Sequence, residues 1–330
     1  MKILINPYPH IFQNKGGIQK RVLEHKRLIG DSVEKIEIFN PIIKVRDFDI
    51  VTTFKPQYGN YDVFLEAKKN KLKTVTHVIQ ELPDSYLNLL VKKFSSKLPF
   101  FISNLQRQII ENSDALIALS DLEKKNLLKR FSLVQNKIHI VPNAINSTVF
   151  LKPKSNLFLE KYDIKSPYVL SVGRIEPNKN QLSIARALKN LGIDLILIGE
   201  RVDKEYAKKI EEFCFVKIIE DINYGSDELI SAYKNSSLFI LASFKEISPN
   251  TVIEAALCEV PVVCTKNTVS IHQYFSNSIE YIDPTSVLDI TIKVSNILKR
   301  KNKLNTKEIV LNYFSEEKIA EQHLKIYNQL

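Results

Sequence analysis

The chain has 330 residues, of which 44% are hydrophobic and 25% charged, and its formal net charge is +10. These values are typical of a folded protein of about two domains. No apolar run approaches the ~18 residues that a membrane span needs, and the first ten residues lack a signal-peptide core and cleavage site. We therefore expect a cytoplasmic protein.

The positive charge suggests an anionic partner, either nucleic acid, a nucleotide or an acidic membrane surface. Charge alone does not choose among these partners. The basic residues are scattered and no nucleic-acid-binding motif is present, so no nucleic-acid partner is expected. The three cysteines, Cys214, Cys258 and Cys264, have no metal-like spacing and fit a reducing compartment.

The first half of the chain alternates short apolar runs with amphipathic segments. The runs are rich in Ile, Val and Thr, as buried parallel strands should be. The expected strands are 2–6, 35–39, 49–54, 73–78, 115–120 and 138–143. Helices are expected over 17–30 and over 121–131, the latter opened by an N-cap at Ser120 or Asp121.

The second half repeats this alternation. Its expected strands are 168–173, 194–199, 216–220, 238–243, 260–265 and 279–283, with helices over 181–191 and 226–236 among them. Two successive β-α alternations predict two Rossmann-like, doubly wound parallel sheets of the α/β class, facing a cleft. We place the N-terminal domain at 1–150, a linker at 151–166 and the second domain at 167–310. Open sheets of this kind bind ligands beyond the carboxyl ends of their strands.

Three strand-end loops carry candidate chemistry. Gly16 and Gly17 precede the first helix, where glycine lets a backbone approach an anion. A flexible turn is the alternative, and no Gly-x-Gly-x-x-Gly occurs, which argues against an NAD-dependent dehydrogenase. Arg174 and Lys179, in "SVGRIEPNKNQ", are placed to hold a diphosphate, or else belong to a solvated basic loop.

The third loop opens "KEISPNTVIEAALCEVPVV" at 245–263. Ser248 is expected to cap a helix whose first residue is Pro249. Glu254 lies within that helix and Glu246 in the loop before it. An ionised carboxylate only accepts hydrogen bonds, which suits sugar or ribose hydroxyls. A surface acid that compensates the helix dipole is the alternative.

Together these motifs resemble the retaining glycosyltransferases of the GT-B fold, specifically family 4 (glycosyl transferases group 1). The resemblance covers nearly the whole chain. It rests on "GGIQKRVLEH", "KTVTHV", "SDALIALSD", "KIHIVPNAIN", "SVGRIEPNKNQ", "KEISPNTVIEAALCEVPVV" and "FSEEKIAEQHLKIY". The last of these is similar to the terminal helix, here 311–330, that packs near the domain junction.

The resemblance assigns roles. Arg174 and Lys179 would bind the nucleotide diphosphate and stabilise the leaving group. Glu246 would hold hydroxyls of the donor sugar, and Glu254 would accept hydrogen bonds from the ribose. Gly16 and Gly17 would close over the phosphates. His77 would lie beside the transferred sugar, with a structural histidine at a strand end as the alternative.

The remaining histidines are assigned from their positions. His25 falls on the apolar face of its helix and is expected in a core, and the others are read as structural or surface residues. Those others are His10, His139, His272 and His323.

The chain departs from the family pattern after Glu246. Ile247, Ser248 and Pro249 stand where the family often has Gly-Phe-Gly. Because proline has no N–H, backbone contacts to the donor are expected to shift to Asn250 and Thr251. Ser248 is also expected to bind the donor. This departure bears on the donor sugar more than on the reaction.

Departure of a nucleoside diphosphate builds negative charge, which fixed cations and helix N-termini stabilise. We therefore expect a nucleotide-sugar donor as substrate, no cofactor and no metal. No Asp-x-Asp stands in a suitable strand-end loop. The family expectation is transfer to a glycan or lipid-linked acceptor with anomeric configuration retained, in surface polysaccharide or glycolipid assembly. Whether the donor is UDP- or GDP-linked is not readable here.

The stretch 90–108 mixes basic and aromatic residues. It is either a peripheral contact with an anionic membrane, at the inner face, or an ordinary surface helix. Its cations and phenylalanines are Lys92, Lys93, Lys97, Arg107, Phe94, Phe100 and Phe101.

Two other functions stay open. A nucleotide-sugar epimerase could use the same fold, and a non-catalytic nucleotide or glycan binder could use the same cleft.

Overall fold

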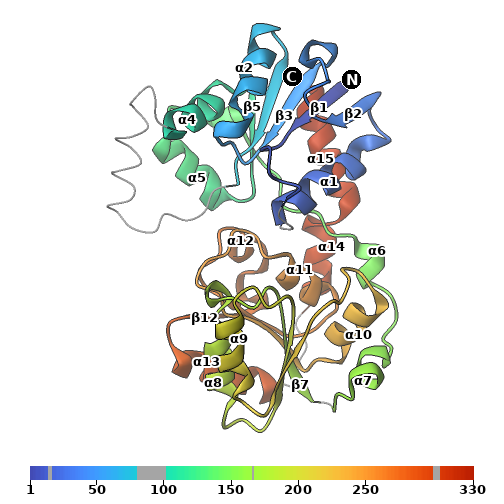
Figure 1. The fold of residues 1–330 in the computed structure, drawn as a ribbon, viewed down its shortest axis with the longest axis vertical. Coiled ribbons are helices and arrows are strands. Elements are labelled where there is room, and N and C mark those ends of the chain that lie inside the picture. Colours follow the sequence, from blue (N-terminus) through green and yellow to red (C-terminus); the bar gives the residue numbers. More distant parts are fainter. Residues whose placement is uncertain (14–16, 80–101, 166, 300–304) are drawn as a thin grey trace. The chain divides into compact units, whose positions relative to one another are not determined.

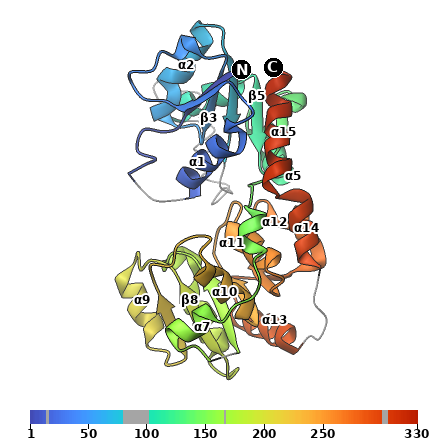
Figure 2. The same cartoon turned by 90° about the vertical axis from the view of Figure 1, so that its right-hand side faces the viewer.

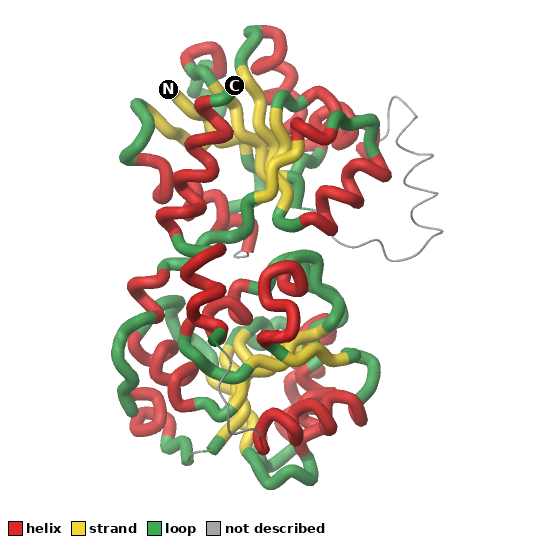
Figure 3. The backbone as a smooth tube through the Cα atoms, turned by 180° about the vertical axis from the view of Figure 1, so that it is seen from behind, coloured by secondary structure: helices red, strands yellow, loops and turns green. Residues whose placement is uncertain are grey.

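The computed structural model describes residues 1–330 except 14–16, 80–101, 166 and 300–304. The chain divides into two compact units. Unit 1 comprises Met1–Ala144 with Glu316–Leu330, and unit 2 comprises Ile145–Ser315. In each unit a parallel six-stranded sheet is covered by helices on both faces, as Figure 3 shows in yellow and red.

The sheet of unit 1 has the order β2-β1-β3-β4-β5-β6. Its strands are β1 (Lys2–Asn6), β2 (Lys35–Ile38), β3 (Ile50–Phe54), β4 (Lys73–His77), β5 (Ala115–Ala118) and β6 (Ile138–Ile140). Its helices are α1 (Gly17–Gly30), α2 (Tyr61–Lys69), α4 (Ile102–Asn112), α5 (Asp121–Arg130) and α15 (Glu316–Asn328). The two chain ends lie at the same end of this unit (Figure 1).

The sheet of unit 2 has the order β12-β11-β10-β7-β8-β9. Its strands are β7 (Tyr168–Val172), β8 (Asp194–Ile198), β9 (Val216–Ile219), β10 (Leu238–Leu241), β11 (Val262–Thr265) and β12 (Glu280–Ile282). Its helices are α6 (Ser147–Phe150), α7 (Leu157–Tyr162), α8 (Gln181–Leu188), α9 (Lys204–Glu211), α10 (Asp227–Asn235), α11 (Asn250–Leu257), α12 (Ile271–Phe275), α13 (Val287–Lys299) and α14 (Thr306–Tyr313).

All twelve strands expected from the sequence are present, with bounds within three residues of the prediction. The pattern was readable because helices cover both faces, so the central strands are mostly buried along their length: Ile3, Leu4 and Ile5 of β1 are all 0% exposed. The four expected helices are also present. Ser120 caps α5 as expected, its side chain accepting a hydrogen bond from the Glu123 N–H.

The division between the units differs from the expected bounds of 1–150 and 151–166. The structure changes unit at Ala144, and the expected linker contains helix α7. Phe150 and Phe158, both 0% exposed, belong to the core of unit 2. The segment expected to be a linker therefore belongs to unit 2, because its apolar side chains pack in the core of that unit.

The terminal segment 311–330 is shared between the units. Helix α14 belongs to unit 2, whereas α15 returns to unit 1 and packs against α1 (Figure 2). Ile319 and Ile326 of α15 are buried in one cluster with Ile3 and Val75 of the sheet. The last helix is thus part of the N-terminal unit's core.

Each sheet has one point where the winding reverses. In unit 2 the chain winds from β7 to β8 and β9 on one side, then to β10, β11 and β12 on the other. The reversal lies between β7 and β10, and in unit 1 it lies between β1 and β3. Ligands of such sheets bind outside the carboxyl ends of the strands at this point.

Candidate functional site

The loop after β7 is held in place by amide side chains. Asn180 adopts a left-handed conformation, with φ 58°, which asparagine tolerates better than most residues. Its Nδ2 donates to the carbonyls of Ala242 (3.1 Å) and Pro284 (2.7 Å). Gln181 Nε2 donates to the carbonyl of Arg174 at 2.8 Å. These bonds anchor the 174–181 loop over the end of the neighbouring strand β10.

Lys179 and Glu246 meet at this point. Lys179 Nζ lies 2.5 Å from Glu246 Oε1, and the two side chains are 19% and 12% exposed. Lys179 follows β7 and Glu246 follows β10, the strands that flank the reversal of winding. The backbone joins the same two loops, because the Phe244 N–H donates to the Asn178 carbonyl at 2.9 Å. The sheet topology therefore creates the pair.

A third loop fixes the backbone of Glu246. Its N–H donates to the Asn267 carbonyl (3.0 Å), and its carbonyl accepts from the Val269 N–H (3.2 Å). Asn267 Nδ2 also donates to the Phe244 carbonyl at 3.0 Å. A carboxylate held in this way is preorganised for binding rather than left on a loose loop.

Arg174 lies in the same loop as Lys179 but has a different partner. Its guanidinium donates to Glu176 at 2.9 Å, and the side chain is 57% exposed. An exposed pair of this kind contributes at most about 1 kcal/mol. Arg174 therefore exchanges Glu176 for another anion at little cost.

Helix α11 begins one residue later than the sequence suggested. Ser248 does not cap it: Pro249 occupies the cap position in an extended conformation (φ −74°, ψ 107°), and no side-chain cap hydrogen bond is made there. Proline is favoured at a first helical position, but here its ψ takes it out of the helical region. Asn250 and Thr251 are the first two residues of the helix.

Glu254 is more enclosed than a residue that simply reaches into a cleft. It is 3% exposed, and its Oε2 accepts a hydrogen bond from the Tyr233 hydroxyl at 2.8 Å. Burial and the neighbouring Glu254 carboxylate raise the pKa of Tyr233 well above its usual range, so the phenol stays protonated and donates. Helix α10 thus holds the carboxylate of α11.

Gly199 allows the backbone of two loops to come into contact, and it was not predicted from the sequence. With φ 153° at the end of β8, it lies so near the first site loop that a Cβ would stand 2.1 Å from the Gly173 carbonyl oxygen. The signal was available, because glycine ends both "YVLSVG" and "DLILIG". Glycine here lets two strand-end loops touch.

The remaining candidates belong to unit 1. Gly17 opens α1, and open space surrounds the position that its Cβ would occupy. Gly16 lies outside the described residues. His77 ends β4 and is 0% exposed, stacked on Phe54 with 3.9 Å between ring centroids. A sugar contact by His77 stays a prediction.

The basic and aromatic stretch at 90–108 is largely outside the described residues. Its described part is in α4, where Arg107 pairs with Glu111 at 2.9 Å. That guanidinium is therefore already engaged. Along the described part of the chain, no helix combines the length and apolar character that crossing a bilayer requires.

Two doubly wound parallel sheets, with a charged pair at the reversal point of the second, define the architecture of the GT-B class. Residues 157–308 match the family described as "Glycosyl transferases group 1". Residues 157–308 thus match the group 1 glycosyltransferases and the fold is that of the GT-B class, which confirms these two parts of the resemblance read from the sequence.

Curated relatives and solved structures agree with this assignment. Over 241 residues the chain is 25% identical to N-acetylgalactosamine-N,N'-diacetylbacillosaminyl-diphospho-undecaprenol 4-alpha-N-acetylgalactosaminyltransferase of Campylobacter jejuni, covering 70% of this chain and 60% of the relative. It is 25% identical over 202 residues to O-antigen chain mannosyltransferase B of Escherichia coli, covering 58% and 53%. Anabaena HepE, solved with UDP and glucose, superposes with a TM-score of 0.75 over 100% of both chains at 15% identity.

The match thus spans about half to three-fifths of these curated relatives' length. At 15% identity the likeness to HepE establishes the fold alone.

Proposed function

We propose that this protein is a retaining glycosyltransferase that moves a sugar from a nucleoside-diphosphate sugar to a glycan or lipid-linked acceptor. The observation that carries the proposal is the Lys179–Glu246 pair, 2.5 Å apart at the reversal point of unit 2. A cation and a carboxylate at this spacing can be spanned by one donor, with its diphosphate on Lys179 and its sugar on Glu246.

Without a donor, the side chains of Lys179 and Glu246 form an ion pair with each other. When a donor binds, its phosphate oxygens accept from the Lys179 ammonium, and sugar hydroxyls donate to the Glu246 carboxylate. Each group exchanges one partner for another, so neither is left buried and unpaired. Arg174, whose pairing with Glu176 is exposed, supplies a second cation to the diphosphate.

These groups suit the departure of a nucleoside diphosphate. The sugar–phosphate bond breaks, and its electron pair leaves with the phosphate oxygen. Lys179 and Arg174 stabilise the charge that develops there, and fixed charges of this kind are usually the largest catalytic contribution. We propose that the acceptor hydroxyl attacks from the leaving-group face and passes its proton to the departing phosphate oxygen, so that the anomeric configuration is retained, without a metal at the diphosphate.

Further donor contacts, beyond those of Lys179 and Glu246, are proposed for residues of α11. Asn250 and Thr251 open this helix after β10, and the N–H groups at a helix start favour an anion or a hydroxyl oxygen. Glu254, held by Tyr233, lies one turn further on and is proposed to accept from the ribose. The acceptor class is suggested by the relatives, whose names include an undecaprenol-linked sugar and an O-antigen chain.

A screen of UDP- and GDP-sugars, with release of nucleoside diphosphate as the readout, tests the proposal. Lys179→Ala and Glu246→Ala should each lose transfer while keeping the wild-type unfolding temperature to within a few degrees. Lys293→Ala is the matched control, because it breaks a 3.1 Å ion pair with Glu280 at the amino end of β12, away from the site.

Turnover in either site variant equal to that of the wild type would refute the assignment. Product analysis with and without acceptor separates the other two functions. An epimerised nucleotide sugar without acceptor supports an epimerase, and donor binding without turnover supports a binder. The same assay in EDTA tests metal independence at the donor site.

A further inference from the structure

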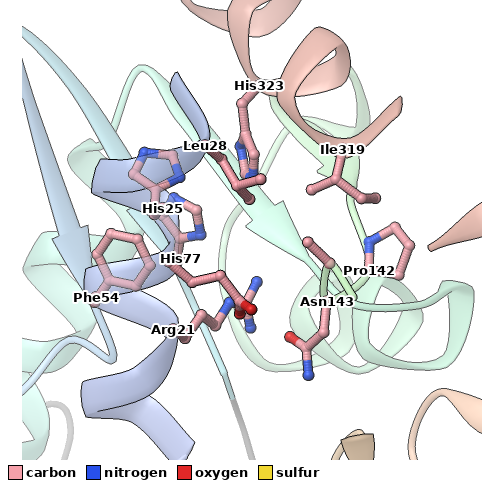
Figure 4. Close-up of a pocket in the computed structure, with 11 residues that line it drawn as sticks. Arg21, His25, Leu28, Phe54, His77, Pro142, Asn143, Ile319 and His323 are labelled. Atoms are coloured by element: carbon pink, nitrogen blue, oxygen red, sulfur yellow. The ribbon is translucent and has the colours of Figure 1, made fainter. Parts of the chain in front are cut away.

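We propose that His25, His77 and His323 form a binding site for a divalent transition-metal ion, with Zn²⁺ the best suited. The three residues come from α1, β4 and α15, which pack together within unit 1. One ring nitrogen from each lies within 4.8 Å of the others, and the side chains are 2%, 0% and 4% exposed. Figure 4 shows the three rings gathered at one cavity.

The cavity has room for an ion. Its volume is about 20 Å³, enough for one particle the size of a water molecule. Nitrogens around a tetrahedral Zn²⁺ stand about 3.4 Å apart, given Zn–N bonds of about 2.0–2.1 Å. Metal binding therefore requires these ring nitrogens to move closer together by up to about 1.4 Å.

The rings have unused binding capacity. Nδ1 of His25, both ring nitrogens of His77 and Nδ1 of His323 are buried without a hydrogen-bond partner. Leaving such groups unsatisfied costs about 1–3 kcal/mol each, so a structure rarely retains several together without a ligand. A metal ion would engage one nitrogen of each ring at once.

A supporting hydrogen bond already orients His25. Its Nε2 lies 2.8 Å from the Tyr327 hydroxyl, which in turn donates to Thr52 Oγ1 at 3.3 Å. If the Tyr327 proton points to Thr52, then His25 Nε2 is the donor and Nδ1 carries the lone pair. Metal-binding histidines characteristically donate their second nitrogen to such a partner.

The electrostatics of the cavity favour the ligating form of histidine. Burial, aided by the nearby Arg21 charge, holds the pKa of His25 at about 3, and burial likewise holds the pKa values of His77 and His323 well below their usual range. Neutral imidazole is the form that binds metal. Arg21 and Glu24 also line the cavity, and the Glu24 carboxylate offsets the Arg21 cation that would oppose a metal.

A metal here would link parts of the chain that are distant in sequence. His323 lies 298 positions after His25, and the ion would tie the last helix to the first helix and the sheet of unit 1. The site is separate from the Lys179–Glu246 pair, which belongs to unit 2. Its role would be to fix α15, and it gives the His77 ring a use different from the predicted contact with the transferred sugar.

The test uses the full chain after treatment with a chelator. Co²⁺, the probe, should bind at one equivalent with the visible absorption of a tetrahedral nitrogen-ligated ion. Zn²⁺ at 100 times its dissociation constant should raise the unfolding temperature by about 4 °C if the whole chain unfolds together, and by about 8 °C if unit 1 unfolds alone. His323→Phe should abolish both signals. His139→Phe, a histidine of β6 outside the cluster, is the matched control and should keep them.

The proposal is overturned if the wild type binds no stoichiometric metal, as expected when the cavity holds only a water molecule. It is also overturned if His323→Phe binds metal as the wild type does. If that variant does not fold, His323→Asn serves in its place, since it removes the ring with less change in polarity.

Discussion

The two sheets of this protein are both parallel and six-stranded with a single reversal of winding, but they differ in strand order and in the chemistry at their carboxyl ends. In unit 2 this end carries the partly exposed Lys179–Glu246 ion pair. In unit 1 it carries buried, uncharged histidines, of which His77 ends β4 directly. The comparison teaches that the winding of the sheet positions a site, whereas the side chains after each strand decide what it binds.

Removal of the charged pair should have the largest effect. Lys179→Ala should lower kcat/KM for the donor about 10²–10³-fold, as loss of one fixed charge-stabilising group typically does. Because the two groups act together, Lys179→Ala with Glu246→Ala should cost less than the product of the single effects. Steady-state kinetics of the four proteins measures this. Fully multiplicative losses would show that the two groups act independently.

The next largest effect is expected where the loops after β7 and β8 touch, at Gly173 and Gly199. Gly199→Ala places a Cβ 2.1 Å from a carbonyl oxygen at φ 153°, so we expect it to lower the free energy of unfolding by about 2–4 kcal/mol. Gly192→Ala is the matched control, since its φ is also positive (64°) but open space surrounds the Cβ. It should cost about 1 kcal/mol. Chemical denaturation compares the two, and equal losses would remove the argument from loop contact.

Acid should destabilise unit 1 through its histidines. An unfolded histidine titrates near pH 6.5, whereas folded His25 titrates at about 3. Between these values the unfolded chain binds more protons, so stability is full above pH 6.5 and is lost as the pH falls. From pH 7 to 5 the metal-free protein should lose about 2 kcal/mol of stability through His25. His77 and His323, whose pKa values burial also lowers, should add to this loss.

Denaturation curves at both pH values check this, and the loss should be smaller in His323→Phe than in the wild type. An unchanged pH dependence in that variant would show that His323 is already accessible to protons in the folded state.

The smallest effect concerns the support of Glu254. Tyr233→Phe removes the phenol that donates to this buried carboxylate at 2.8 Å, and it should cost about 1–2 kcal/mol of unfolding free energy. Tyr313→Phe, at a 51% exposed tyrosine of α14, should cost less than about 0.5 kcal/mol. If both variants match the wild type, the hydrogen bond contributes nothing to the α10–α11 contact.

Much of the fold was predictable because its signals are local. Strands that are covered on both faces appear in the sequence as short apolar runs. Lys179 and Glu246 were predicted as site residues because they lie in the loops after strands 168–173 and 238–243. The start of α11 was missed by one residue, since the backbone of Pro249 and not its identity decides where the helix begins. The domain bounds differed because Phe150 and Phe158 are buried by partners that lie far along the chain.

By itself, the sequence determined the class of fold, the positions of its strands along the chain and the loops that carry chemistry. Only the tertiary structure decided which side chains meet. The 2.5 Å pairing of Lys179 with Glu246 depends on β7 and β10 being neighbours. The gathering of His25, His77 and His323 depends on α15 returning to unit 1. Periodicity reports which face of an element is buried, but the partner across that face is set by packing between distant segments.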